Sequence, residues 1–195
     1  MSDYLYAVRC NFTDPAREGA WNAWYGGPKM AQMLALPLMI SVQRYEAMAL
    51  DTRRKYLALW RVAGPETFET KEYKAQWGFA EWTNLIADWS RDLYRGEGDL
   101  DAAVDVKDGE ALYFAVFEGA AAKDDVARIA AQRPSALWLE AAGLDRRASV
   151  AGVARHPAAW RPDPIDRAPA GFSEALLRPM APRRRAKLPN GRVGG

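Results

Sequence analysis

The sequence has little of the chemistry that many enzymes place at an active site. Cys10 is the only cysteine among 195 residues, so no disulfide can form within the chain, and a reducing compartment is expected. His156 is the only histidine, and no G-x-S-x-G pattern supplies a nucleophile for a catalytic triad. Because H-x-x-x-H, H-E-x-x-H and C-x-x-C patterns are also missing, the sequence predicts no metal site.

Long apolar runs and nucleotide motifs are missing as well. The longest apolar run, residues 33–40, is broken by Pro37 and is too short to span a membrane. Residues 1–4 have neither the basic start nor the apolar stretch of a signal peptide. Without a P-loop or a G-x-G-x-x-G pattern, no nucleotide or other cofactor is predicted. We therefore expect a soluble cytoplasmic protein that does not act at a membrane.

Charge is unevenly distributed along the chain. Residues 181–195 hold five basic residues and no acid, so this segment carries a charge of +5, whereas the whole chain has a net charge of +2. Residues 1–180 therefore carry 2 − 5 = −3. Nucleic-acid-binding domains present basic residues across a folded face, so no nucleic-acid partner is expected. The basic, Pro- and Gly-containing end is interpreted as a flexible, solvated tail.

Hydrophobic periodicity in residues 1–96 predicts a β-α-β-β-α-β order, which is that of a ferredoxin-like unit. Alternating aromatic and β-branched residues over 4–12 indicate the first strand. A helix is expected from residue 13 to about residue 36, with a kink at Gly26-Gly27-Pro28. The remaining predicted elements are strands at 39–49 and 54–63, a long helix from Gly64 to about Trp89, and a short edge strand at 90–95.

The second half reads as a degenerate copy of the first. An acidic, Gly-flanked segment at 97–109 is interpreted as a linker. Residues 110–180 repeat a β-α-β pattern but lack a second long helix. The predicted elements are strands at 111–118, 147–154 and 173–179 and a helix over 124–142 that Pro134 splits and Gly143 ends. The chain is therefore expected to be α+β, with two related halves, a linker and a tail.

Aromatic side chains are the abundant feature, with eight tryptophans, eight tyrosines and six phenylalanines. The tryptophans are concentrated in the first half, where Trp21, Trp24 and Tyr25 share one face of the predicted helix. Two interpretations stay open. The rings either fill a solid core or line a pocket for a flat, apolar ligand.

Four short patterns in the first half resemble the EthD-like branch of the dimeric α+β barrel superfamily. They are Trp21-x-x-Trp24-Tyr25, Leu34-x-x-Pro37, Arg44-Tyr45 and the strand 56–60. The resemblance implies a sheet-to-sheet barrel, formed within one chain or between two, and a homodimer. It also implies an isomerase, cyclase, lyase or oxygenase. The sequence departs from the family in two places: Lys29 stands where relatives often carry a histidine, and Pro37-Leu38 replaces the usual Pro-Gly.

Four residues are the candidates for chemistry. Lys29, if buried beside tryptophan, would have a lowered pKa and could act as a base; otherwise it lies at the surface over Trp24. Tyr25 and Asp88 are the other candidate proton carriers, and Arg44 is the candidate clamp for an anionic group. Arg44 and Tyr45 point to opposite faces of one strand, so only one of them can face the helices.

The expected ligand is a small aromatic or lactone-like molecule. Its predicted binding residues are Tyr6, Arg9, Trp24, Trp60, Trp77, Trp82 and Trp89. An inward arginine either clamps a substrate or pairs with Asp88 or Asp92, which would share a helix face in an ion-pair network. The leading hypothesis is a cofactor-independent isomerase, cyclase or lyase. The alternatives are a non-catalytic binding or accessory protein and an oxygenase, for which His156, although followed by Pro157, could hold haem.

Overall fold

The computed structural model describes residues 3–51 and 53–187. Its strands are β1 (Asp3–Phe12), β2 (Met39–Leu50), β3 (Tyr56–Val62), β4 (Ile86–Gly96), β5 (Glu110–Glu118), β6 (Leu137–Leu144), β7 (Ala148–Pro157), β8 (Phe172–Pro179) and β9 (Arg184–Arg185). Its α-helices are α1 (Glu18–Trp24), α2 (Met30–Leu34), α3 (Lys71–Gln76), α4 (Leu100–Val104) and α5 (Lys123–Gln132). Tyr25–Lys29 forms a π-helical turn, η1, and Pro65–Glu69 and Ala80–Leu85 form the 3₁₀ turns η2 and η3.

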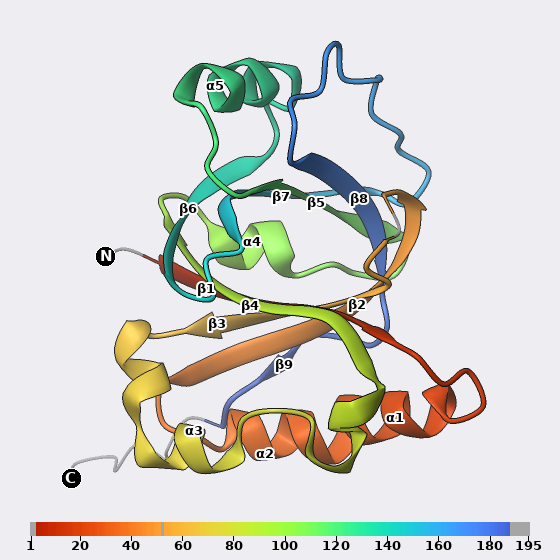
Figure 1. Ribbon diagram of the computed structural model, residues 1–195, viewed down its shortest axis with the longest axis vertical. Coiled ribbons are helices and arrows are strands. Elements are labelled where there is room, and N and C mark those ends of the chain that lie inside the picture. Colours follow the sequence, from red (N-terminus) through yellow and green to blue (C-terminus); the bar gives the residue numbers. More distant parts are fainter. Residues whose placement is uncertain (1–2, 52, 188–195) are drawn as a thin grey trace, which may run out of the picture.

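Within those residues, the strands β1 to β8 close into one antiparallel barrel (Figure 1). The order around the ring is β3-β1-β4-β6-β7-β5-β8-β2, and β2 pairs again with β3. Each of these strands has a neighbour on both sides, so the barrel has no free edge. The ring closes within one chain. The homodimer stays a prediction, but it is not needed to complete the barrel.

The two halves of the barrel have equivalent strand orders. The first four strands are arranged as β4-β1-β3-β2, and the last four as β8-β5-β7-β6. The halves meet at two seams, where β4 pairs with β6 and β2 pairs with β8. In Figure 1, α1, α2 and α3 lie against the outside of the first half, and α5 lies on the opposite side of the molecule.

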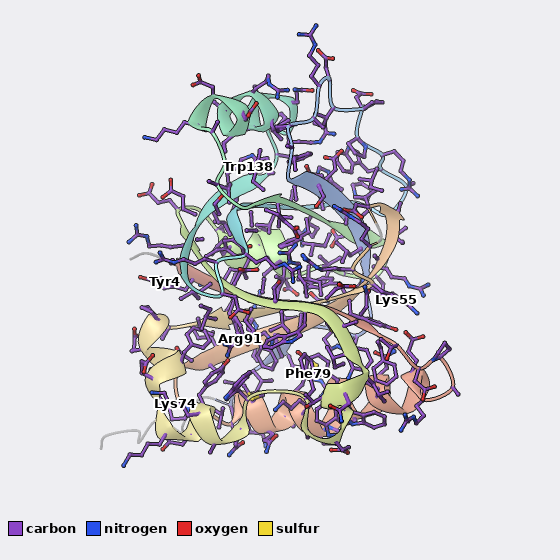
Figure 2. The ribbon with its side chains drawn as sticks, in the orientation of Figure 1. Tyr4, Lys55, Lys74, Phe79, Arg91 and Trp138 are labelled. Carbon is purple, nitrogen blue, oxygen red and sulfur yellow. The ribbon has the colours of Figure 1, made fainter. Side chains whose placement is uncertain are left out.

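Strand alternation divides the side chains into an outer and an inner set. On β1, Tyr6, Val8 and Cys10 face outward and join the core beneath the helices, which fits the predicted alternation of this strand. Leu5 and Ala7 face inward and join the core inside the barrel. Side chains fill the spaces on both sides of the strands, and the labelled Phe79 and Arg91 lie between the sheet and the helices (Figure 2).

The segment expected to be a linker instead enters the barrel. In α4, Leu100 and Val104 are buried and pack among the inward side chains of the strands. The hydroxyl of Tyr45 donates a hydrogen bond of 2.5 Å to the carbonyl of Val104. Burial of these leucine and valine side chains stabilises the fold. Residues 97–109 are therefore part of the core packing and not a solvated spacer.

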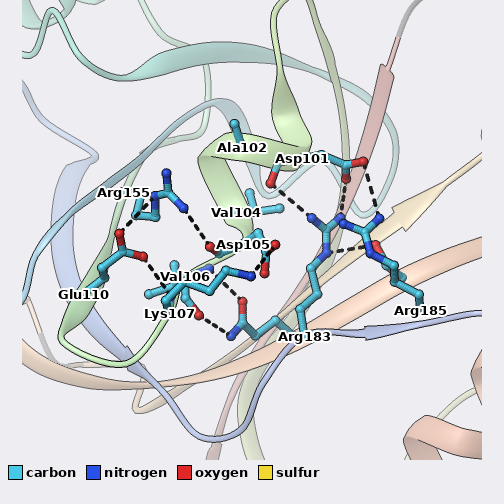
Figure 3. Close-up of polar contacts among 12 residues, drawn as sticks. Asp101, Ala102, Val104, Asp105, Val106, Lys107, Glu110, Arg155, Arg183 and Arg185 are labelled. Carbon is cyan, nitrogen blue, oxygen red and sulfur yellow. Dashed lines mark hydrogen bonds and ion pairs between the residues drawn. The ribbon is translucent and has the colours of Figure 1, made fainter.

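The beginning of the expected tail is also packed against the barrel. Arg184–Arg185 forms β9, which pairs with the start of β2. The buried Arg183 side chain donates to Asp101, to which Arg61 and Arg185 are also paired (Figure 3). Asp101 thus anchors the C-terminal segment to α4, and the prediction of a solvated tail is wrong for residues 181–187. The rest of the predicted tail, 188–195, lies outside the described residues.

Two helix predictions are wrong because barrel pairing overrides local pattern. The predicted helix from Gly64 consists of η2, α3 and η3, interrupted at Gly78, whose φ is +95°. Strand β4 then starts at Ile86 and pairs with both β1 and β6, so it is no edge strand. In the second half, α5 ends at Gln132 before Pro134, and Gly143 lies in β6.

The described residues contain no helix long and apolar enough to cross a membrane. Whether the protein resides in the cytoplasm stays a prediction.

The buried position of α4 predicts a large stability loss when its core contact is truncated. Leu100→Ala should lower the free energy of unfolding by about 2–5 kcal/mol, because a cavity replaces the leucine. Met48→Ala on the exposed face of β2 is the matched control and should cost much less. Urea denaturation measures both. Equal, small losses for the two variants would contradict the placement of α4 inside the barrel.

Candidate functional site

The aromatic residues of the first half come together between the sheet and the helices. We call this set the aromatic layer; it consists of Tyr6, Trp21, Tyr25, Tyr56, Trp60, Phe68, Tyr73 and Phe79. Its rings contact one another: the centroids of Trp21 and Tyr56 lie 4.8 Å apart, and those of Tyr6 and Phe68 lie 4.9 Å apart. Because these rings pack against one another, they support the interpretation that the aromatic residues fill a solid core.

Arg44 is the charged group at the centre of the layer. Its side chain projects from β2 toward the helices, while Tyr45 projects into the barrel, as strand alternation requires. Its guanidinium carbon lies 4.2 Å from the ring centroid of Tyr25 and 4.8 Å from that of Trp21. Its Nη2 donates 2.8 Å to the side-chain oxygen of Asn22. Cation–π contacts of this kind partly replace the lost hydration of a guanidinium.

No carboxylate pairs with Arg44 among the ion pairs of the described residues. Only 3% of the residue is exposed, and this burial lowers the pKa of Arg44. A buried charge without a counter-ion is costly, so this position is a candidate for holding an anion. Burial also favours the neutral form of Tyr25, whose pKa is therefore raised.

Lys29 lies at the border of the layer and is buried rather than at the surface. It stands at the end of the π-helical turn η1, which Gly26-Gly27-Pro28 forms in place of a regular helix. Its ammonium group donates to the carbonyl of Gln76 and lies 6.0 Å from the ring centroid of Trp24. Burial lowers the pKa of Lys29, as the sequence analysis expected for a buried lysine.

The other predicted residues are distributed over three places. Trp24 and Trp82 are half-buried at the border of the layer, with ring centroids 6.3 Å apart. Trp77 and Trp89 are exposed, and the guanidinium of Arg91 stacks on Trp77 at 4.2 Å. Asp88 and Arg9 lie at the open end of the barrel, away from the layer.

The predicted helical ion-pair face of Asp88 and Asp92 does not form, because both residues lie in strand β4. Asp88 is exposed, has a φ of +51° and accepts a hydrogen bond of 3.1 Å from the Asn11 amide. Asp92 is fully buried and pairs with Arg9, so the predicted structural partner of an inward arginine is confirmed for this pair.

Two cavities lie largely outside the aromatic layer, and Tyr56 is the one residue of the layer that lines either of them. One, of about 420 Å³, lies at the open end of the barrel and is lined by Arg9, Arg54 and Glu118 among others. The other, of about 600 Å³, lies between the segment that follows α4 and residues 179–185. Neither is lined by a tryptophan, so the predicted Trp-walled hollow is not one of these cavities.

Sequence reasoning missed several residues of the layer. Asn22, which holds Arg44, and Tyr73, whose hydroxyl lies 3.1 Å from that of Tyr6, carry no motif that separates them from ordinary helix residues. Cys10 is buried in the same core, within electrostatic reach of Arg44. His156 stacks on Trp160 at 3.6 Å and contacts Ser135 at 3.2 Å, far along the chain from the layer.

Buried polar atoms without a hydrogen-bond partner mark the helix side of the layer. They include Trp21 Nε1, Thr67 Oγ1 and Gln76 Oε1. Native structures leave few such atoms unpaired, and a ligand is one way to satisfy them. Within the described residues, no group of three or more His, Cys, Asp or Glu side chains is placed to hold a metal ion.

Comparison with known proteins identifies the fold. No family model matches the sequence, and no curated protein matches it. Among solved structures, the chain is similar to an anthrone oxidase-like protein, with a TM-score of 0.57 at 10% identity over 94% of this chain and 93% of that chain. A candidate monooxygenase from Lactobacillus acidophilus NCFM gives a TM-score of 0.49 at 7% identity, over 91% and 94% of the two chains. At these identities, the first likeness shows a shared α+β barrel fold, and the second supports no conclusion.

The buried thiol provides a direct test of how tightly the layer is closed. Burial raises the pKa of Cys10 to about 12, so at pH 8 its thiolate fraction should be on the order of a thousandfold below that of a free cysteine. Native protein should therefore react with DTNB far more slowly than protein unfolded in urea. Rapid labelling of one thiol in the native protein would contradict a closed layer.

Proposed function

We propose that this chain is a cofactor-independent enzyme, of the oxygenase type, that acts on a small aromatic or cyclic molecule at the aromatic layer. The observation that carries the proposal is Arg44, a buried cation held by Asn22 and three aromatic rings. Among the described residues no carboxylate forms an ion pair with it, although the charge of Glu46 on the same strand acts on it from a greater distance. The fold shared with an anthrone oxidase-like protein supports the same reaction class.

The proposed chemistry begins with loss of a proton from an activated C–H or O–H group of the substrate. Lys29, whose lowered pKa favours the neutral amine, takes this proton. Arg44 stabilises the resulting anion in a site from which water is excluded, where the electrostatic attraction is strong. The electron-rich anion then reacts with dioxygen. For an activated methylene the balance is R₂CH₂ + O₂ → R₂C=O + H₂O.

Access to the layer is proposed through its cover. The cover consists of short pieces, the turn η1, the six-residue helix α3 and residues 77–79, instead of one long helix. Gly78 and Ala80 both have positive φ values, +95° and +49°, so the chain is bent sharply beside Phe79. Phe79 covers Tyr25, with ring centroids 6.1 Å apart, and its displacement would expose both Tyr25 and the Arg44 site.

The isomerase, cyclase or lyase predicted from the resemblance would share the first step. Reprotonation of the same anion at another atom gives an isomer and consumes no oxygen. We also propose that each half is a ferredoxin-like unit and that the chain is a distant member of the dimeric α+β barrel superfamily. The equivalent strand orders of the two halves support this assignment.

Oxygen uptake tests the proposed reaction. With a panel of anthrones, naphthols and phenols, the protein should consume dioxygen with at least one compound. Arg44→Gln should lower kcat/KM about a hundredfold or more, because the anion loses its charged partner. Arg44→Lys should retain part of the activity, and thermal melting verifies that each variant is folded. An isomerised product without oxygen uptake, or binding without turnover, would contradict the oxygenase assignment.

The pH profile tests the role of Lys29. Since only the neutral amine accepts a proton, the rate should rise with pH as Lys29 deprotonates, at a pH below the ordinary lysine value of about 10.4. Lys29→Met should abolish this rise and lower the rate about a hundredfold. Lys74→Met, at an exposed lysine paired with Glu69, is the matched control and should leave the profile unchanged. An unaltered profile in Lys29→Met would remove Lys29 as the base.

A further inference from the structure

The open end of the barrel contains a second, independent feature that the proposed reaction does not use. The cavity of about 420 Å³ lies where β1 and β5 end and where β3 and β8 begin, on the inner face of the strands. This volume is within the usual range for small-molecule sites, which often occupy barrel mouths. On β1, Arg9 faces this cavity, whereas Tyr6, Val8 and Cys10 face the aromatic layer on the other side of the sheet.

The floor of the cavity is apolar. It is lined by the side chains of Leu57, Phe114, Val116 and Leu177, which belong to the core inside the barrel. These side chains pack with the other inward residues of the barrel, and only 2–5% of each residue is exposed. An apolar molecular body placed on this floor would itself leave water, at a gain of roughly 25 cal/mol for each Å² of its surface that is buried.

The wall of the cavity holds three arginines around one carboxylate. Arg54 pairs with Glu118 at 2.5 Å, and Arg9 pairs with the same carboxylate at 3.4 Å. Arg54, Arg9 and Arg147 together lower the pKa of Glu118. Glu118 itself is about one third exposed at the edge of the cavity. Its carboxylate therefore occupies a position that an outside anion could take.

Arg9 is the buried member of this cluster and is incompletely satisfied. Only 5% of the residue is exposed, and its ion pair with Asp92, like that with Glu118, measures 3.4 Å. Within the part of the chain that the structure describes, its Nε has no hydrogen-bond partner. Opposite Arg9 on β4, the buried hydroxyl of Ser90 has no partner among the described residues, and neither has that of Tyr94, further along the same strand and within electrostatic reach of Arg9. Buried donors without partners are rare, and guanidinium groups match carboxylates in geometry.

The charges of the cluster balance. Arg9 and Arg54 share the Glu118 carboxylate, Arg9 also pairs with Asp92, and the charge of Arg147 acts on Glu118 as well. Among the other acids of the lining, Asp51 pairs with Arg53 and Glu174 with Arg133, whereas Asp88 keeps its charge because its partner is the neutral Asn11 amide. Three positive charges therefore face three negative ones, Asp88, Asp92 and Glu118, so a ligand anion must replace Glu118 rather than add to it.

We propose that the barrel mouth binds a small organic carboxylate, with its acid group on Arg9 and Arg54 and its apolar or aromatic body on the inner floor. In this arrangement Glu118 is an internal competitor that the ligand carboxylate displaces. Apart from Tyr56, which belongs to both linings, the site lies outside the aromatic layer, so it can be tested by binding alone and stands or falls independently of the proposed oxygenase activity.

Calorimetric titration with two matched pairs of probes tests the site. Octanoate is compared with octanamide, and 2-naphthoate with 2-naphthamide, because each pair differs only in the charge of its head group. At least one carboxylate should bind with one-to-one stoichiometry and about tenfold more tightly than its amide. Equal affinity of acid and amide in both pairs, or no binding of either acid, would overturn the proposal.

Three variants then locate the binding. Arg54→Gln should weaken carboxylate binding about tenfold and leave amide binding unchanged. Glu118→Gln should tighten carboxylate binding severalfold, an outcome that mere structural damage would not produce. Arg17→Gln is the control, since its exposed side chain pairs with Asp14 outside the cavity, and it should change affinity less than twofold. Unchanged binding in Arg54→Gln or weaker binding in Glu118→Gln would contradict the assignment.

Discussion

Closure of the barrel within one chain is the constraint on which the rest of the structure depends. Strands β4 and β6 form one seam between the halves, and β2 and β8 form the other. Once the ring is closed, the alternation of side chains along each strand fixes two separate environments. Outward residues of the first half meet the helices, and inward residues meet α4 at one end of the barrel and the cavity at the other.

Strand β1 shows how this constraint separates two kinds of chemistry. Its outward residues Tyr6 and Cys10 belong to an aromatic layer with one buried cation, Arg44. Its inward residue Arg9 belongs to a cluster of arginines and carboxylates above an apolar floor. The first environment favours stabilisation of an anion formed in a reaction, and the second favours recognition of an anion that already exists. One strand thus contributes side chains to both proposed sites, from its two opposite faces.

The parts of the fold that follow local rules could be predicted from the sequence. The alternation in β1 and the break at Gly26-Gly27-Pro28 set the local structure. The prediction that only one of Arg44 and Tyr45 faces the helices is confirmed, but the sequence did not say which, and the structure places Arg44 on that side. The strands β4 and β6 could not be predicted over their full length, because residues 86–89 and 137–142 have a helix-like pattern and pair only with distant partners. The burial of α4 and of Arg183 likewise depends on contacts between residues far apart in sequence, Arg183 with Ser41 and Asp101.

Hydrogen exchange at the two seams tests intrachain closure most directly. The amides of β6 opposite β4 and those of β8 opposite β2 should be protected to the same degree as those of the β1–β3 pair, which lies inside one half. Because closure is intramolecular, this protection should not change when the protein is diluted a hundredfold. Seam amides that exchange like those of loops, or that lose protection on dilution, would show that the barrel is not closed within a single chain.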